Sequence, residues 1–145
     1  MARDFFSAEE KKWIREAILE AEKGTSGEIQ VHLENHAMKP LAERVQEVFN
    51  ILEISETSRR NGVLFYLAIK DRQFAILGDA GIDQVVEPGF WDAIRQHMEV
   101  MFREGKFTDG ICDGIRMAGE QLAKYFPITK DDRNELPDDI SFGNN

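Results

Sequence analysis

Acidic and amide side chains recur beside glycines in this sequence, and their oxygen atoms are suited to bind a hard metal ion. The set consists of Glu28, Asn61, Asp79, Asp83 and Glu87. Carboxylate and amide oxygens are the ligands that Ca²⁺ and Mg²⁺ take, and several like charges gathered in one pocket are costly without a cation. The neighbouring glycines permit close approach of the backbone, so carbonyl oxygens can complete the shell. This pattern predicts a divalent-metal site, provided that the fold brings the five residues together.

The most regular segment of the chain is an apolar run at 63–69 that follows Asn61-Gly62. Seven apolar residues rich in branched and aromatic side chains are too few for an ordinary helix, so the run predicts a strand buried on both faces. The charged tetrad at 70–73 then precedes a second apolar run at 74–77. Two such runs around a short polar segment predict a β-hairpin.

An earlier strand is predicted from strict alternation at 28–34, where Ile29, Val31 and Leu33 share one side. Its polar side is expected to be partly wet or covered by other polar groups. Pro40 opens an apolar stripe of helical spacing that continues to Leu52, so strand, helix and strand form a βαβ unit with parallel strands.

Three further helices are expected from the 3.6-residue spacing of apolar side chains. The first begins at a capping box made by Ser7 and Glu10, the next covers about 89–103, and the last is capped by Thr108 and ends before Pro127. These elements predict an α/β protein, a three-layer α/β/α sandwich with a mixed, mostly parallel central sheet that contains one β-hairpin. We place a single domain at residues 1–128 and a polar C-terminal tail at 129–145.

Strand direction decides where the candidate ligands lie. If the strands that begin at Glu28 and Asn61 are parallel, and the strand that ends at Asp79 is antiparallel to them, these three residues and Asp83 collect at one sheet edge. The following helix can bring Glu87 to the same place. The alternative is that these acids are solvated loop and cap residues.

The opposite sheet edge is a rival site, because α/β sheets bind ligands beyond the carboxyl ends of their parallel strands. His36 follows the first strand, and Asp71 and Arg72 lie at the hairpin tip. Histidine titrates near neutrality and arginine can hold a phosphate or carboxylate in a forked contact. The alternative is ordinary turn chemistry, in which Asp71 pairs with a neighbour.

Charge and cysteine content narrow the possible partners. An excess of 27 acidic over 18 basic residues gives a net charge of −9, which argues against nucleic acid and favours cations or basic surfaces, unless it serves solubility alone. Cys112 is the single cysteine, so no intramolecular disulfide forms, and its acidic neighbours are unsuited to a catalytic thiol. No apolar run reaches 18 residues, so we expect a cytoplasmic chain without membrane insertion.

Five motifs in this order resemble the TPM domain family, which includes thylakoid-lumen photosystem-repair proteins and many bacterial proteins. They are Ser26-Gly27-Glu28-Ile29, the Asn61-Gly62 strand, the Asp71-Arg72 turn, Gly81-Ile82-Asp83, and the segment Phe102 to Phe107 with Gly110 and Gly114. The resemblance implies the same three-layer sandwich and divalent-cation binding at an acidic loop cluster. Many relatives have glycine where Asp79 stands, so this residue is the least secure ligand.

Two functions are consistent with these residues. The first is a Ca²⁺- or Mg²⁺-binding interaction module, in which the ion orders acidic loops and presents a surface to an unidentified protein partner. The alternative is a metal-assisted phosphatase, an activity that the resemblance implies through plant members of the family, with Arg59 and Arg60 as the nearest phosphate clamp. The usual nucleotide-binding and hydrolase motifs do not occur. A further hypothesis is that Leu136 to Phe142 docks onto a subunit or partner, or packs on its own domain.

Overall fold

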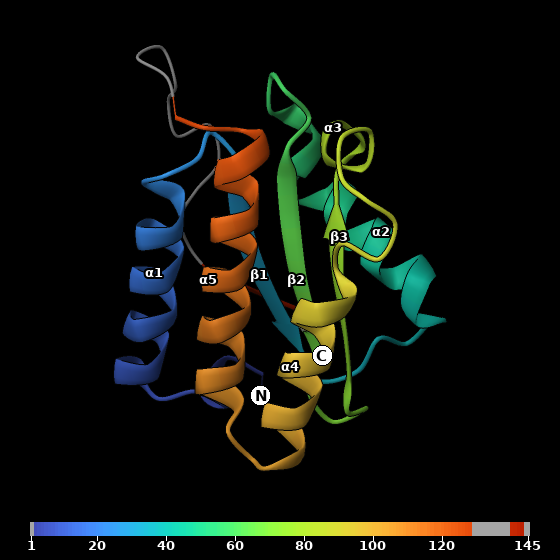
Figure 1. The fold of residues 1–145 in the computed structure, drawn as a ribbon. Coiled ribbons are helices and arrows are strands. Elements are labelled where there is room, and N and C mark those ends of the chain that lie inside the picture. The colour runs from blue at the N-terminus through green and yellow to red at the C-terminus, as the bar shows by residue number, and fades with distance from the viewer. Residues whose placement is uncertain (1, 129–139, 144–145) are drawn as a thin grey trace.

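The computed structural model describes residues 2–128 and 140–143 (Figure 1). Eleven elements occur in this part of the chain. In order they are η1 (Ala2–Asp4), α1 (Ala8–Glu22), β1 (Glu28–Glu34), α2 (Leu41–Ile51), η2 (Ile54–Glu56), β2 (Gly62–Ala68), β3 (Gln73–Gly78), α3 (Ala80–Asp83), α4 (Asp92–Arg103), α5 (Phe107–Tyr125) and β4 (Ile140–Phe142).

The described strands form one mixed sheet in the order β3-β2-β1-β4. β1 and β2 are parallel, with Glu28 opposite Gly62, and β2 and β3 are antiparallel, with Val63 opposite Gly78. The predicted βαβ unit and hairpin are therefore confirmed. β4 adds a second parallel neighbour to β1, with Ile140 opposite Val31.

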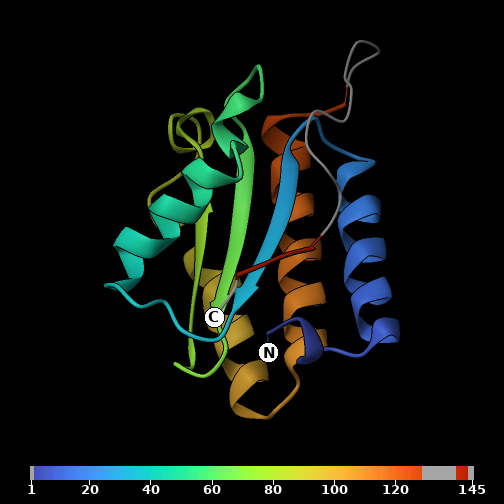
Figure 2. The same ribbon diagram turned by 180° about the vertical axis from the view of Figure 1, so that it is seen from behind.

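Helices cover both faces of the sheet, which confirms the three-layer α/β/α architecture. α1, α4 and α5 lie on one face, in front of the sheet in Figure 1, and α2 lies on the other face, as the reverse view of Figure 2 shows. On the three-helix face Ile29, Val31 and Leu33 pack into a large apolar core together with α5 residues. On the other face Leu64, Tyr66 and Ala68 pack with Val45, Val48 and Phe49 of α2 and with Ile54. Alternate residues of β2 thus enter two separate cores, so this strand is buried on both faces as expected.

The polar side of β1 is buried along the whole strand. The sequence predicts that this side is either partly wet or covered by other polar groups, and the burial decides between the two. Glu28, Gln30, His32 and Glu34 are each at most 6% exposed. Arg44 of α2 and Tyr66 of β2 bind Glu34, and Ser141 of β4 lies beside His32, so the second environment, cover by other polar groups, holds and the wet one does not. Burial of so many polar groups is tolerable only when they find partners.

Two helix starts differ from the predictions. α4 begins at Asp92 rather than at Gly89, because Gly89 has a positive φ of 81° and so belongs to the turn before the helix. The Thr108 cap is wrong: α5 begins at Phe107, and the Thr108 hydroxyl donates to Glu10 Oε2 at 2.6 Å. The Ser7–Glu10 capping box of α1 is confirmed.

β4 lies in the segment at 129–145 that the sequence predicts to be a polar tail. Its three residues pair with β1, and the Gly143 N–H donates to the Leu33 carbonyl at 2.8 Å. Residues 136–139 of the proposed docking segment lie outside the described residues. In the part of the chain that is described, no helix has the length and apolar character needed to cross a bilayer.

Candidate functional site

Three of the five predicted ligands meet at one end of the sheet, which we call the acidic edge. Glu28 begins β1, Asn61 directly precedes β2, and Asp79 directly follows β3. Backbone hydrogen bonds tie them together: the Glu28 N–H donates to the Asn61 carbonyl at 3.4 Å, and the Asp79 N–H donates to the Gly62 carbonyl at 3.0 Å. This placement follows from strand direction, as expected.

Asn61 is the most unusual group at the acidic edge. It is 1% exposed, its Nδ2 donates to Ser26 Oγ at 3.1 Å, and its N–H donates to Thr57 Oγ1 at 3.0 Å. Its Oδ1 is buried and accepts no hydrogen bond from any described residue. A buried amide oxygen without a partner has lost its hydration without compensation, so it is suited to receive a cation or a donor group.

Asp79 is already engaged by a cation of the protein itself. Its two carboxylate oxygens accept from Arg60 Nε at 2.7 Å and Arg60 Nη2 at 2.8 Å, and Oδ1 also accepts the Ala80 N–H at the start of α3. Asp79 is 5% exposed, whereas about half of the Arg60 side chain is exposed. The forked guanidinium therefore neutralises the carboxylate from the solvent side.

Asp83, the last residue of α3, and Glu87, on the segment that follows α3, are both exposed. Among the described residues, no group of three or more histidine, cysteine or acidic side chains is placed to hold a metal ion. The backbone thus brings Glu28, Asn61 and Asp79, two carboxylates and one amide, to neighbouring strand ends, whereas Asp83 and Glu87 are exposed.

Gly81 explains how this loop approaches the sheet so closely. A Cβ at this position would lie 2.6 Å from the Arg60 carbonyl oxygen, and the Gly81 N–H donates to that same oxygen at 2.9 Å. Any side chain would push α3 away from the acidic edge. The glycine therefore serves the close backbone approach that the sequence predicts.

The opposite end of the sheet, which we call the hairpin edge, is held by Asp71. His36 Nδ1 lies 2.8 Å from Asp71 Oδ1, and the Ala37 N–H donates to Asp71 Oδ2 at 2.8 Å. The hydrogen bonds of His36 and Ala37 lower the pKa of Asp71. Asp71 thus pairs with a neighbour and joins the hairpin tip to the end of β1, which matches the turn chemistry given as the alternative.

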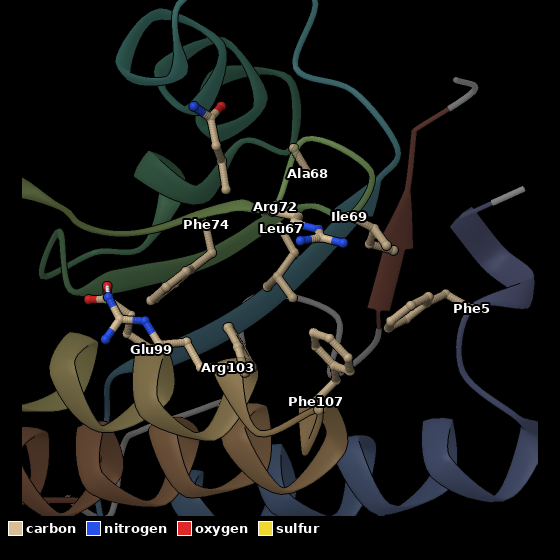
Figure 3. Close-up of a pocket in the computed structure, with 12 residues that line it drawn as sticks. Phe5, Leu67, Ala68, Ile69, Arg72, Phe74, Glu99, Arg103 and Phe107 are labelled. Atoms are coloured by element: carbon tan, nitrogen blue, oxygen red, sulfur yellow. Dashed lines mark hydrogen bonds and ion pairs between the residues drawn. The ribbon is translucent and has the colours of Figure 1, made fainter.

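A cavity of about 670 Å³ lies beside the hairpin tip (Figure 3). It is bounded by the end of β2, the hairpin, the junction of α4 and α5, and Phe5. Arg72, which the sequence singles out as an anion contact, lines it together with four phenylalanines. The aromatic lining is not evident from the sequence because Phe5, Phe74, Phe102 and Phe107 are widely separated along the chain.

A buried polar network on β1 is the second feature that the sequence does not reveal. Glu34 is fully buried and accepts Arg44 Nε at 2.8 Å, Arg44 Nη2 at 2.7 Å and the Tyr66 hydroxyl. Its Oε1 lies 3.2 Å from His32 Nε2, and His32 Nδ1 lies 2.7 Å from Ser141 Oγ of β4. A carboxylate only accepts, so His32 Nε2 carries the proton and Nδ1 accepts from the Ser141 hydroxyl.

The pKa shifts in this network agree with an ionised Glu34 and a neutral His32. Burial alone raises the pKa of Glu34, but its hydrogen bonds with Arg44, Tyr66 and His32 outweigh burial and lower it. Burial lowers the pKa of His32 despite the nearby carboxylate. The order hydroxyl, imidazole, carboxylate resembles that of nucleophilic enzymes, yet here it is buried between a strand and α2 and serves to fasten β4 to the sheet.

Cys112 is buried in α5, and burial raises its pKa to about 11. The thiol is therefore protonated near neutrality.

Comparisons with known proteins give three findings. The family model of the TPM domain matches residues 2–121, a range that includes both edges of the sheet. No curated protein matches the sequence. Among solved structures, the chain is similar to the NMR structure of the BA42 protein from the psychrophilic bacterium Bizionia argentinensis, with 49% sequence identity, 96% of each chain covered and a TM-score of 0.91.

Proposed function

The chain belongs to the TPM domain family, and from that premise we propose that it is a divalent-cation-binding domain that acts as an interaction module. In this proposal Ca²⁺ or Mg²⁺ binds at the acidic edge, orders the loops there and presents their surface to a protein partner. The net charge of −9 favours a cation and a basic partner surface over an anionic one.

The observation that carries the proposal is the buried Asn61 Oδ1, which accepts no hydrogen bond within the described part of the chain. It lies at the edge where β1 and β2 begin, next to the buried Glu28 and the nearly buried Asp79. An amide oxygen and two carboxylates are hard ligands that fit either cation. Glu28, Asn61 and Asp79 would hold the ion, which supplies fixed positive charge, while Asp83 and Glu87 are the acids that a reordered loop can add.

The Arg60 guanidinium competes with a metal ion for the carboxylate of Asp79. For Asp79 to become a ligand, it must give up at least part of its forked contact with Arg60. The cation and the guanidinium then compete for one carboxylate, so removal of Arg60 should strengthen cation binding. If Asp79 is not a ligand, loss of Arg60 leaves the affinity for the cation unchanged. Substitution of Arg60 therefore tests whether Asp79, the least secure of the predicted ligands, binds the cation.

The alternative function is a metal-assisted phosphatase. It needs an open coordination position on the metal and a cationic group to hold the transferring phosphoryl group. Arg60, a guanidinium at this edge, is engaged by Asp79, and Arg59 Nη1 is 3.2 Å from Ser26 Oγ. We therefore favour binding over catalysis, and a phosphatase assay on the same protein sample distinguishes the two.

The experiment is a two-dimensional amide NMR titration of the chelator-treated protein with Ca²⁺ and then Mg²⁺. We expect saturable shifts at residues 27–28, 61–62 and 78–87. A cation that binds only the folded state also stabilises it, by about 2.7 kcal/mol at a hundredfold excess over its dissociation constant. Chelator-sensitive turnover of p-nitrophenyl phosphate would promote the phosphatase alternative.

Variants assign the ligands. Glu28→Gln should abolish the shifts and the stabilisation, while Glu120→Gln, an exposed acid on α5, should leave both intact. Arg60→Gln should tighten binding about tenfold, the loss of a charge-assisted contact of about 1.5 kcal/mol. Absence of shifts up to millimolar cation in both the native protein and the Arg60→Gln variant would refute the proposal.

A further inference from the structure

The cavity at the hairpin edge has the size and position of a small-molecule site. Its volume of about 670 Å³ lies within the range of about 300–1,000 Å³ that ligand pockets occupy. It opens where β2 ends, and α/β sheets bind ligands beyond the carboxyl ends of their parallel strands. The acidic edge lies at the other end of the same strands, so this cavity is a separate site.

The walls of the cavity are mainly aromatic. Phe5, Phe74, Phe102 and Phe107 line it, and the buried Leu67 and Ala68 at the end of β2 complete its apolar surface. The rings hold one another edge to face, with centroids 5.0 Å apart for Phe74 and Phe102 and 5.3 Å apart for Phe5 and Phe107.

Two of these rings remain incompletely covered. Phe5 is 38% exposed and Phe107 is 37% exposed, and both border the cavity. Exposed aromatic surface that faces an apolar hollow gains free energy when an apolar group enters it. The body of a ligand for this cavity is therefore aromatic or aliphatic.

The charge of the lining is positive, in contrast to the protein as a whole. The lining contains two arginines, Arg72 and Arg103, and one acid, Glu99. Glu99 forms an ion pair with Arg103 Nη2 at 2.5 Å. The Arg72 side chain makes no ion pair or hydrogen bond to another described residue, and Figure 3 shows its guanidinium projecting over the cavity near Leu67 and Ile69. An arginine without an internal partner among the described residues, beside apolar walls, is well suited to bind an anion.

The backbone holds Arg72 in an uncommon conformation. Its φ is 55°, in the left-handed region that residues with a Cβ seldom adopt, and its N–H donates to the Ile69 carbonyl at 3.2 Å. The ion pair and hydrogen bond of Asp71 to the end of β1 fix the preceding residue. The guanidinium is thus presented by a hairpin tip that is tied down on one side, which lowers the entropy lost when it binds a ligand.

We propose that this cavity binds an organic carboxylate whose aromatic or short aliphatic body packs among the phenylalanines and whose carboxylate is held by Arg72. The planar guanidinium fork matches a carboxylate, which explains why an anion is preferred over a neutral molecule of the same shape. A cationic ligand is disfavoured because the only acid of the lining is already paired. Inorganic phosphate satisfies Arg72 but leaves the aromatic walls unused.

The test uses three probes of one shape and different charge: 4-phenylbutyrate, 4-phenylbutanol and 4-phenylbutylamine. Amide NMR titration of the full chain should show saturable shifts at 67–74 and 99–107 with the acid, weaker shifts with the alcohol and the weakest with the amine. Arg72→Gln should weaken binding of 4-phenylbutyrate about tenfold and leave binding of 4-phenylbutanol unchanged, since only the charged contact is lost. Arg95→Gln, an exposed arginine of α4 outside the lining, is the matched control and should change nothing.

A second variant and a peptide arm complete the design. Phe107→Ala should weaken binding of the acid and of the alcohol equally, because both ligands pack against the aromatic wall of the cavity. A short peptide that ends in phenylalanine, compared with its C-terminal amide, distinguishes a free metabolite from a protein C-terminus as the source of the carboxylate; binding of either source supports the proposal. Equal binding of acid and amine, an Arg72→Gln variant that binds the acid as the native protein does, or no saturable shift with any carboxylate at millimolar concentration would overturn it.

Discussion

Substitution of Arg44 by methionine tests whether the buried carboxylate of Glu34 governs the stability of the sheet. Methionine keeps an aliphatic stem of similar length but removes both hydrogen bonds to Glu34, from Nε at 2.8 Å and from Nη2 at 2.7 Å, and with them the contact of Nη1 with Glu47. Glu34 is fully buried and Arg44 largely so, with 18% of its side chain exposed. Loss of one partner from such a pair leaves a charge without compensation, which costs about 3–5 kcal/mol.

Protonation limits this penalty. Once Arg44 is gone, burial dominates and the Glu34 carboxyl is cheaper to bury as the neutral acid. Protonating it costs about 1.4 kcal/mol for each pH unit above an unfolded pKa of about 4.3. The loss of stability in Arg44→Met should therefore be about 3–4 kcal/mol at pH 7 and only about 1 kcal/mol at pH 5.

In the native protein, acid should remove the stability that Glu34 contributes, whereas the Arg44→Met variant gains stability on acidification. The pKa of Glu34 is lowered in the folded state, so its contribution is present above the unfolded pKa and is lost as the pH falls through the folded value. Native stability should therefore be insensitive to Glu34 between pH 5 and pH 7, where only the variant gains stability on acidification.

Urea unfolding followed by circular dichroism at pH 5 and pH 7 measures both quantities. Arg95→Met, at an exposed pair with Asp92, is the matched control and should stay within about 0.5 kcal/mol at either pH. The double variant Glu34→Gln with Arg44→Met should lose the part of the pH dependence that comes from Glu34, because no carboxyl remains at position 34. A penalty below about 1 kcal/mol at pH 7, or one that is equal at both pH values, would refute this account of the network.

Three smaller predictions concern other positions. A Cβ at Gly143 would lie 2.7 Å from the Glu34 Cβ, so Gly143→Ala should destabilise by about 1–3 kcal/mol in urea, whereas Gly24→Ala, with its nearest atom 3.8 Å away, should not. Asp71→Asn should speed amide hydrogen exchange at the hairpin tip at neutral pH, and this difference from the native protein should vanish as acid protonates Asp71, whose pKa is lowered by its hydrogen bonds. Cys112 should react with a thiol reagent at pH 8 only after unfolding, since its pKa is raised to about 11; equal rates with and without urea would contradict its burial.

The fold was predictable because its signals are local and repeated. The apolar run of β2, the alternation of β1 and the helical stripe between them fix two parallel strands, and the short polar segment at 70–73 fixes the hairpin. Strand direction then places Glu28, Asn61 and Asp79 at one edge, so the meeting of these three needed no knowledge of side-chain contacts.

The parts that escaped prediction depend on contacts between distant residues. β4 has only three residues, too few to show a period, and its register depends on the Ser141–His32 hydrogen bond and on the space that Gly143 leaves beside Glu34. The engagement of Asp79 depends on Arg60, whose φ of 52° turns the loop toward the edge. Neither contact has a signature at short sequence separation.

The distribution of polar groups along the central strands gives the two ends of the sheet different chemistry. At the acidic edge, Asp79 has an internal cation, and the buried Asn61 oxygen has none, so this end can gain by taking up a cation. At the hairpin edge, Asp71 is satisfied by His36 and Ala37, which leaves Arg72 as the uncompensated charge beside an apolar cavity. The C-terminal end of β1 carries the self-sufficient network of Glu34, whose partners are all side chains of the protein. Because the length of the paired strands β1 and β2 separates them, the two ends should bind their ligands independently, and occupancy of one should leave the affinity of the other unchanged.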